Sequence, residues 1–251
     1  MQPPHRARSR FSQLGIKPFF FVTFKERMEV MAKKAFLDVI RGGDFFILDT
    51  ETTGLGDDAE ICQIAVIDPA GRTILDTLVK TTKPIPAGAS AIHGITNEAV
   101  AKAPGWGPVS QFLCALLVNT NVVIYNANYD LRVMQSSTVL SDQGGGGGGC
   151  DVAHLIKDKC HCAMLEYAKF YGDWNDYHRS YRWQKLSAAA RQCGVTVENA
   201  HDALGDCLMT LGVVQHMVAK ENEREANSKI QGGNAIGERE QTGGAEGADE
   251  A

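Results

Sequence analysis

The chain has 251 residues, enough to bury a sizeable core in one or two domains, and 44% of them are hydrophobic, as in an ordinary soluble globular protein. The formal net charge of −5 argues against a global basic field of the kind that attracts nucleic acid. No apolar run approaches the roughly 20 residues of a membrane-spanning helix, so we expect no membrane partner and a cytoplasmic location.

Residues 1–25 are basic at first and apolar later, without a clean apolar segment followed by a small-residue cleavage site. We interpret them as a poorly ordered extension. Alternatively, the protein functionally begins at Met28 or Met31, and the assigned translation start lies too far upstream. A helical rhythm of apolar residues follows over 25–40. We therefore expect one folded domain over 26–222.

The predicted strands come next in the chain. Strand-like segments occupy 44–50, 61–68 and 72–80, and the turn signal at 68–71 joins the second and third into a hairpin. A helix over 109–117 precedes a fourth, fully apolar strand at 122–125, and a short strand at 160–164 lies among further helices. Strands that alternate with helices predict an α/β sheet, which the hairpin makes mixed.

Two segments have compositions that cannot pack a core. The run of six glycines, Gly144–Gly149, predicts a flexible loop over 143–150 inside the domain. Residues 223–251 are rich in Gly, Glu and Ala, and we expect them to form a disordered acidic tail.

The seven cysteines lie mostly in apolar helix or strand patterns of a chain too large to need disulfide bonds, so we expect reduced thiols. A cluster of cysteine and histidine residues near 150–162 could suggest zinc, but its spacing is not that of the usual Cys-x₂₋₄-Cys pairs. The cluster comprises Cys150, His154, Cys160, His161 and Cys162.

The stretch Asp49-Thr-Glu-Thr-Thr-Gly-Leu55 directly follows the apolar run Phe45–Leu48. Side chains two apart on a strand share a face, so Asp49 and Glu51 project together from the end of the strand. Two carboxylates this close either share a proton or bind a hard divalent cation through oxygen. The same pair could also be an acidic strand end that faces water, and the rest of the chain has to decide.

Three further residues fall at strand ends or helix starts, where α/β sheets form their ligand sites. Asp130 follows the fourth strand, and Asp206 lies in the first turns of the last helix, five residues after His201. Singly, Asp130 could be a helix-start residue and His201 a structural histidine. Together, four carboxylates suit two divalent ions about 4 Å apart for in-line phosphoryl displacement, and a histidine can take the proton of the attacking water.

The segments 49–55, 126–130 and 201–206 resemble the three motifs of the DEDDh family of 3′→5′ exonucleases. That family includes the proofreading subunit of bacterial replicative DNA polymerase, ribonuclease T and oligoribonuclease. The resemblance covers about residues 42–220 and includes the loop at 92–96. It implies a ribonuclease H-like fold, with a mixed five-stranded sheet flanked by helices on both faces.

The resemblance also implies a role for each matched residue. Asp49, Glu51 and Asp206 would hold one Mg²⁺ or Mn²⁺ ion, while Asp49, and Asp130 through water, would hold a second. His201 would be the general base. The residues expected to border the 3′-terminal nucleotide, with Leu55 against a base, are Thr52, Thr53, Gly54, Leu55, His93 and Asn126.

The implied reaction releases nucleoside 5′-monophosphates from a single-stranded 3′ end. The stretch 49–55 reads most like the DNA-proofreading branch, which favours DNA and a role in proofreading or repair, with or without a DNA polymerase as partner. The alternatives are a 3′→5′ exoribonuclease of the ribonuclease T or oligoribonuclease kind, and a non-catalytic nucleic-acid-binding module.

Aromatic and basic residues interleave over 170–185. This pattern suits either the stacking of single-stranded bases beside cations or a loop packed beneath the last helix, and the sequence leaves both open. The residues are Phe170, Tyr171, Trp174, Tyr177, Tyr181 and Trp183, with His178, Arg179, Arg182 and Lys185 among them.

Overall fold

The computed structural model describes residues 35–143, 149–196 and 201–241, with side chains over 35–142, 149–196 and 201–230. The chain divides after Ala35 into two units, and the fold concerns the second unit. The extension expected over 1–25 and most of the glycine run lie outside the described residues.

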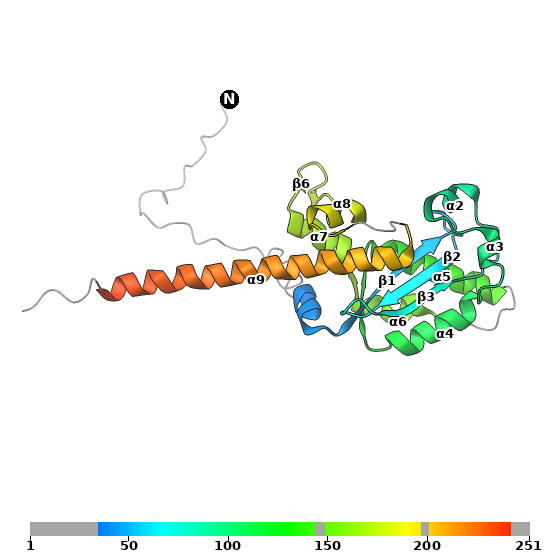
Figure 1. The fold of residues 1–251 in the computed structure, drawn as a ribbon, viewed down its shortest axis with the longest axis horizontal. Helices are drawn as coiled ribbons and strands as arrows, with labels where there is room; N and C mark the ends of the chain where they lie inside the picture. The colour runs from blue at the N-terminus through cyan, green and yellow to red at the C-terminus, as the bar shows by residue number, and fades with distance from the viewer. Residues whose placement is uncertain (1–34, 144–148, 197–200, 242–251) are drawn as a thin grey trace, which may run out of the picture. The chain divides into compact units, whose positions relative to one another are not determined.

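A mixed five-stranded sheet forms the centre of the fold, with the strand order β3-β2-β1-β4-β5 (Figure 1). β2 runs antiparallel to β1 and to β3, whereas β4 is parallel to β1 and β5 is parallel to β4. This arrangement confirms the predicted mixed α/β sheet of the ribonuclease H-like class. The strands are β1 (Phe45–Thr52), β2 (Ile61–Ile67), β3 (Thr73–Leu78), β4 (Asn121–Ile124) and β5 (Cys160–Cys162).

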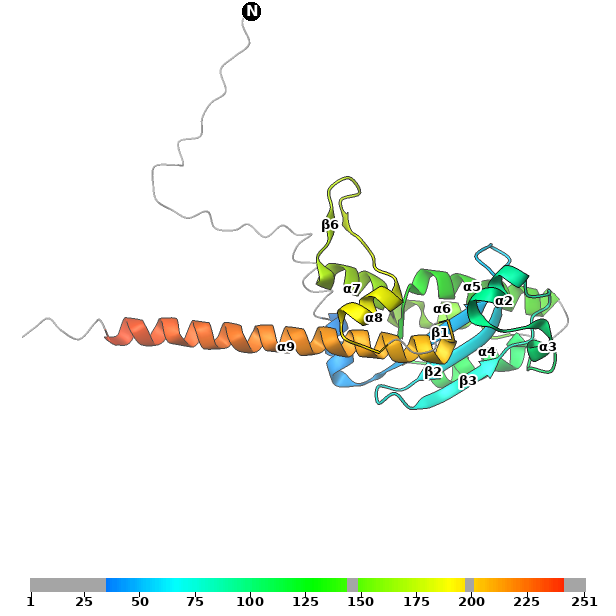
Figure 2. The ribbon, with the colours of Figure 1, turned by 45° about the horizontal axis from the view of Figure 1, so that its top comes forward.

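Helices connect these strands, and a two-stranded hairpin projects beyond the end of α7 (Figure 2). Residues 35–42 are also helical. The helices are α2 (Ala87–His93), α3 (Asn97–Val100), α4 (Trp106–Leu117), α5 (Ala127–Gln143), α6 (Val152–Ile156), the 3₁₀ turn η2 (Lys157–Lys159), α7 (Ala163–Tyr171), α8 (Leu186–Gln192) and α9 (Ala203–Gln241). The hairpin strands are β6 (Trp174–Asn175) and β7 (Ser180–Tyr181).

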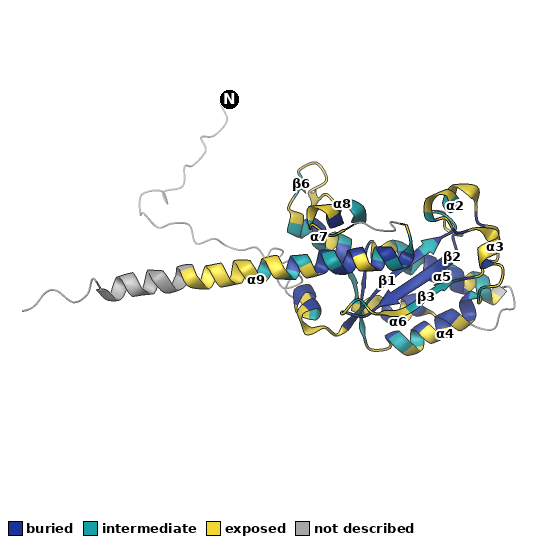
Figure 3. Cartoon of the chain, in the orientation of Figure 1, coloured by how far each residue is buried: buried dark blue, intermediate teal, exposed yellow. Residues whose placement is uncertain are grey.

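Alternate residues of the central strands point into two separate apolar layers, so helices cover both faces of the sheet. Ile47 of β1 packs with side chains of α7, α8 and α9 on one face. Leu48, the next residue, packs with side chains of α4, α5 and α6 on the other face. The central strands β1, β2 and β4 are therefore buried on both sides, as Figure 3 shows.

Helix α9 continues to Gln241, whereas the sequence predicts a disordered tail that begins at 223. Its first turns bury Cys207, Val213 and Met217, whereas the side chains over 219–230 are exposed apart from half-buried Glu221 (Figure 3). Over 219–230, residues that mostly favour helix, with Lys220 three residues before Glu223 and Arg224 three residues after Glu221, support the helix without burial. None of the described helices has both the length and the hydrophobicity that a bilayer crossing requires.

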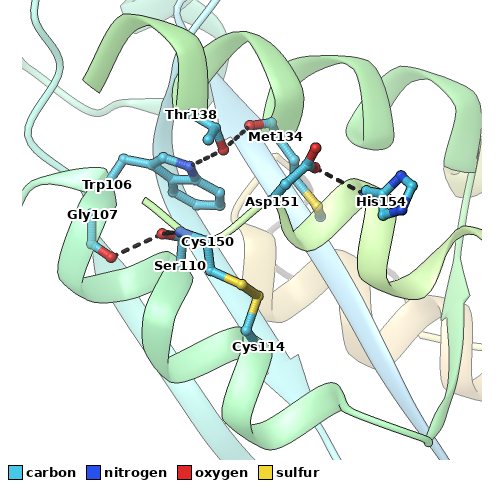
Figure 4. Close-up of a disulfide and its surroundings, with 9 residues drawn as sticks. All are labelled: Trp106, Gly107, Ser110, Cys114, Met134, Thr138, Cys150, Asp151 and His154. Atoms are coloured by element: carbon cyan, nitrogen blue, oxygen red, sulfur yellow. Dashed lines mark hydrogen bonds between the residues drawn. A yellow bond between two sulfur atoms is a disulfide. The ribbon is translucent and has the colours of Figure 1, made fainter. Parts of the chain in front are cut away.

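Cys114 of α4 and Cys150 form a disulfide, which corrects the expectation that all cysteines are reduced (Figure 4). The main-chain N–H of Cys150 also donates to Ser110 Oγ of α4 at 3.0 Å. These contacts fasten the chain to α4 immediately after the glycine run. The other five cysteines are free thiols.

Candidate active site

The end of β1 carries Asp49 and Glu51 on one face, because the two residues are separated by one position of an extended strand. Asp49 is buried beside the core, and Glu51 is half-buried. The pairing of β1 with β2 shifts register between Glu51 and Thr52. Such an irregularity bends the strand locally. Thr52 still pairs with Ile61 and the Thr53 N–H donates to the Glu60 carbonyl at 2.9 Å, so the chain leaves the sheet within two residues of Glu51.

Asp206 in the first turn of α9 completes a group of three carboxylates. One ligand oxygen from each of Asp49, Glu51 and Asp206 lies within 4.8 Å of the other two. An all-oxygen donor set of this kind fits Mg²⁺ or Mn²⁺ rather than a softer metal. The three residues that the sequence predicts to share one metal are therefore close together in the structure.

Burial and mutual repulsion shift the protonation of this cluster. Burial, followed by the charges of Asp130 and Asp206, raises the pKa of Asp49 well above its usual range. Burial and the charge of Asp206 raise the pKa of Glu51 to about 8, and burial also raises the pKa of Asp206. Without a cation the cluster therefore retains protons near neutral pH, and a divalent cation would take their place.

Asp130, in the first turn of α5, lies beside the three carboxylates and is buried. Its Oδ1 accepts a 2.8 Å hydrogen bond from the hydroxyl of Thr50, a residue that the sequence reasoning did not identify. Burial raises the pKa of Asp130 to about 7, although this hydrogen bond opposes the shift. Its charge in turn raises the pKa of Asp49 and Glu51, so all four predicted carboxylates interact electrostatically.

His201 stands exposed just before α9, with a positive φ of 69°. Its main-chain N–H donates to Asp206 Oδ1 at 3.3 Å. The histidine also lowers the pKa of Asp206 through its charge. The predicted general base therefore lies at the solvent side of the carboxylates, next to Asp206.

Gln63 and Asp202 hold the start of α9, and the sequence reasoning identified neither. Gln63 of β2 lies opposite Glu51, and its Nε2 donates to Asp202 Oδ1 at 2.8 Å and to Asp76 Oδ1 at 3.0 Å. Gln63 Oε1 accepts the main-chain N–H of Ala203 at 3.3 Å. A glutamine inside an otherwise apolar strand was the available signal, because a buried polar side chain requires partners.

A cavity of about 560 Å³ opens beside the cluster and includes Glu51 in its wall. All six residues predicted to border a terminal nucleotide line this cavity. Ile92 of α2 also lines it. The side chains of Leu55 and Ile92 are 84% and 62% exposed. The six are Thr52, Thr53, Gly54, Leu55, His93 and Asn126.

Helix α5 fixes the loop that follows β1. The Tyr129 hydroxyl donates to the Gly54 carbonyl at 2.7 Å, and the Arg132 guanidinium donates to the carbonyls of Leu55 and Gly56 at 3.1 and 2.8 Å. Arg132 also lies over the Tyr129 ring, 5.3 Å from its centroid. The loop position of Leu55 is thus set by side chains more than 70 residues away in sequence.

His93 has a defined ring orientation in the cavity wall. Its Nδ1 accepts the main-chain N–H of Ile95 at 3.0 Å, and its Nε2 lies 3.8 Å from Cys62 Sγ. Burial lowers the pKa of His93. The neutral ring with its proton on Nε2 follows from these contacts.

Comparison with known proteins identifies a common family. The model of the exonuclease (RNase T) family matches residues 46–214. The uncharacterized exonuclease CP81 of Escherichia phage 186 is 46% identical over 172 residues, which cover 68% of this chain and 86% of the phage protein. A DNA polymerase III subunit epsilon-like protein of Rhodobacter capsulatus is 31% identical over 176 residues, covering 66% of this chain and 22% of that protein.

The fold is also similar to that of a solved structure, Escherichia coli exonuclease I in complex with a dT13 oligonucleotide. The TM-score is 0.55 at 18% identity, and the match covers 73% of this chain and 42% of exonuclease I. The chain thus spans most of the phage protein, less than a quarter of the Rhodobacter protein and less than half of exonuclease I.

Proposed function

This chain belongs to the DEDD-type 3′→5′ exonucleases, and from that premise we propose that it uses divalent cations to remove nucleoside 5′-monophosphates from single-stranded DNA 3′ ends. The observation that carries the proposal is the group of Asp49, Glu51 and Asp206, whose oxygens approach within 4.8 Å beside the cavity. An acidic surface alone would not explain a cavity of nucleotide-binding size at the same strand end.

The residues present fit two Mg²⁺ or Mn²⁺ ions. Asp49, Glu51 and Asp206 would hold one, and Asp130 beside them would reach the second through water, with Asp49 contacting both. When bound, such ions neutralise the charge that develops on the phosphate and orient the attacking water and the leaving oxygen.

His201 would act as the general base by accepting the proton of the attacking water on its imidazole. Two features of the chain support this role. The hydrogen bond from its main-chain N–H to Asp206 keeps the histidine beside the carboxylates, and its exposure lets the proton pass on to solvent.

The cavity would bind the terminal nucleotide. The apolar side chains of Leu55 and Ile92 would contact the base, while the hydroxyls and main-chain groups of Thr52 and Thr53 would lie near the sugar. Binding through base contact and main chain suits an enzyme that removes any of the four nucleotides.

DNA is the proposed substrate, and a role in proofreading or repair follows from it. The epsilon-like name of the Rhodobacter relative supports both, and it makes a DNA polymerase a candidate partner. An exoribonuclease is the alternative with the same chemistry. A non-catalytic module has less support, because all four carboxylates and the histidine are present.

The test compares 5′-labelled single-stranded DNA and RNA of matched sequence, with Mg²⁺, Mn²⁺ or EDTA. We expect a ladder that shortens from the 3′ end of DNA, and its loss with EDTA or in Asp49→Ala. Asp44→Ala is the matched control, because Asp44 is an exposed carboxylate at the opposite end of β1. No ladder on either substrate would overturn the proposal, and faster cleavage of RNA would favour the exoribonuclease.

A further inference from the structure

The hairpin between α7 and α8 projects from the helices around it (Figure 2). It presents aromatic side chains to solvent. Trp174 is 45% exposed, Tyr177 at the turn is 90% exposed, and Trp183 after the second strand is 59% exposed. Trp174, Tyr177 and Trp183 are therefore not packed beneath the last helix, whereas Phe170 at the end of α7 packs against His216 and Arg224 of α9. Several large apolar rings gathered on one exposed segment indicate a binding surface.

Local contacts hold the hairpin in one conformation. Trp174 and Tyr181 form a cross-strand pair with ring centroids 5.0 Å apart and an edge-to-face angle of 75°. The side-chain oxygen of Asn175 accepts the main-chain N–H groups of Tyr177 and His178. The hairpin backbone that carries Tyr177 and Trp183 is therefore arranged before any partner binds, which lowers the entropy lost on binding.

Cationic side chains accompany the rings. Arg179, Arg182 and Lys185 are exposed, and over 173–185 they outnumber the two acidic residues, Asp173 and Asp176. Arg182 approaches Asp173 only to 3.7 Å, and within the described part of the chain neither Arg179 nor Lys185 has a recorded ion pair. The segment thus carries a small positive charge on a chain of net charge −5.

The chain that leaves the hairpin returns to the end of the sheet that carries the carboxylates, whereas the end of α7, from which the hairpin starts, packs through Phe170 against His216 and Arg224 farther along α9. Strands β1, β4 and β5 are parallel, so their carboxyl ends meet at one edge. Tyr125, immediately after β4, donates its hydroxyl to the Gln184 carbonyl at 2.8 Å. The next residue, Asn126, lines the nucleotide cavity. One short stretch of chain therefore connects the hairpin with the cavity wall.

We propose that the hairpin segment 173–185 binds the single strand upstream of its 3′-terminal nucleotide, with Tyr177 and Trp183 stacking on bases and Arg182 and Lys185 contacting phosphates. This inference rests on the proposed function and extends it. Aromatic faces accept bases of any sequence, and cations hold the backbone. A separate cationic contact also suits an enzyme whose catalytic end is acidic, because that end repels the strand until cations bind there.

The test uses two hairpin variants, Tyr177→Ala/Trp183→Ala and Arg182→Gln/Lys185→Gln. Phe112→Ala is the control, since Phe112 is a similarly exposed aromatic residue on α4. Each protein is assayed on the p-nitrophenyl ester of thymidine 5′-monophosphate, which needs only the catalytic centre, and on a thymidine oligonucleotide of about 20 residues, longer than a typical single-strand site.

We expect both hairpin variants to hydrolyse the ester like wild type, which also shows that they are folded. Their KM for the oligonucleotide should rise about tenfold or more, and the dependence of KM on salt should weaken in the Arg182→Gln/Lys185→Gln variant. The control should match wild type on both substrates.

An unchanged KM for the oligonucleotide in both variants would overturn the inference and would favour a protein partner for the hairpin. Failure of the proposed function is distinguishable, because wild type itself would then cleave neither substrate. In that case anisotropy of a fluorescent thymidine oligonucleotide, measured with EDTA, still tests the hairpin. Equal affinity of wild type and the Tyr177→Ala/Trp183→Ala variant would again overturn it.

Discussion

Asp49 lies where the demands of function and of stability oppose each other. Burial and the charges of Asp130 and Asp206 raise its pKa, so its ionised form destabilises the folded protein when no cation is bound. We predict that Asp49→Asn lowers the exonuclease rate by about 10³-fold or more, because several kcal/mol of charge stabilisation are lost. The same change should raise the Tm in EDTA by about 2–4 °C, which corresponds to about 1 kcal/mol for a domain of this size.

Thermal unfolding at pH 8 in EDTA checks the second half of this prediction. Asp44→Asn serves as the control, since it removes an exposed carboxylate at the other end of the same strand and should change neither quantity. A Tm for Asp49→Asn below that of Asp44→Asn would contradict the prediction.

The pH dependence of stability follows from Glu51 and Asp130. Burial, with neighbouring charges for Glu51, raises their pKa values to about 8 and about 7, above the values of an unfolded chain. Their protonated forms are thus favoured in the folded state. The stability they contribute is fully present below about pH 4 and is lost as the pH rises through the folded values.

We therefore predict that the Tm in EDTA falls between about pH 5 and about pH 9, and that the increase in Tm caused by Mg²⁺ grows over the same interval. Thermal unfolding with and without Mg²⁺ across this range provides the measurement. Glu51→Gln should flatten both curves. An Mg²⁺ effect that does not change with pH would argue against the cluster as the binding site.

At the scale of elements, the junction between β2 and α9 determines where Asp206 lies. Gln63 joins the sheet to Asp202 and Ala203 at the start of the helix, four residues or fewer from Asp206. Gln63→Leu would leave these buried polar groups without their partner, which costs about 1–3 kcal/mol of stability. We predict in addition a kcat about tenfold lower and a higher Mg²⁺ concentration for half-maximal rate, because Asp206 would no longer be held in place.

Metal titrations of the rate distinguish this positioning role from simple destabilisation. Asp76→Asn is the matched control, since it keeps a side-chain oxygen that Gln63 Nε2 can donate to while removing a charge. If Gln63→Leu had the metal dependence of wild type, Gln63 would contribute to stability alone.

The disulfide joins α4 to the chain beyond the glycine run. Closing a loop of 36 residues stabilises the folded state by about 3–4 kcal/mol in the chain-entropy description. We predict that Cys114→Ser/Cys150→Ser loses this amount in urea unfolding under non-reducing conditions but retains exonuclease activity, because neither cysteine lines the nucleotide cavity.

Reductant should lower the stability of wild type to that of the variant and leave the variant unchanged. Thiol titration of the denatured, unreduced protein should find the five free cysteines. Seven reactive thiols, with no effect of reductant on wild type, would show that the pair is not bonded.

Across the whole molecule, what the sequence could predict depended on local regularities. Period-two alternation placed Asp49 and Glu51 on one face, and an apolar run identified the strand before Asp130. The start of the last helix added His201 and Asp206, and the motif resemblance then implied a role for each residue. The structure brings these residues to one sheet edge, although their individual catalytic roles stay predictions.

The parts that the sequence did not reveal depend on contacts between distant segments. Gln63 and Asp202 are 139 positions apart, and Thr52 and Tyr129 are 77 apart, so no local pattern indicates that they meet. Cys114 and Cys150 are neighbours only because α4 packs beside the chain that follows α5. Composition likewise does not reveal that α9 continues to Gln241, since a low content of apolar residues argues against burial but does not exclude helix.

The exposed part of α9 allows the limit of the functional domain to be tested. Beyond 218 its contacts to other elements include those of Arg41, which donates to Asn222 at 2.7 Å and to Glu225 at 2.9 Å, and that of Arg224, which lies over the Phe170 ring of α7 at 5.2 Å from its centroid. Surface contacts of this kind contribute about 0–1 kcal/mol. Deleting residues 221–251 should therefore lower the free energy of unfolding by no more than about 2 kcal/mol and leave the exonuclease rate unchanged.

Arg41→Gln in the full chain is the matched variant, because it removes the Arg41 contacts to α9 without shortening the helix. Truncation after Gly212 should instead unfold the protein, since it removes the buried side chains of Val213, Val214 and Met217 from the layer beneath β1. Urea unfolding and the DNA assay compare the three proteins. A rate lost on deleting 221–251 but kept in Arg41→Gln would mean that the exposed helix itself takes part in the reaction, and the catalytic unit would then extend beyond the sheet and its covering helices.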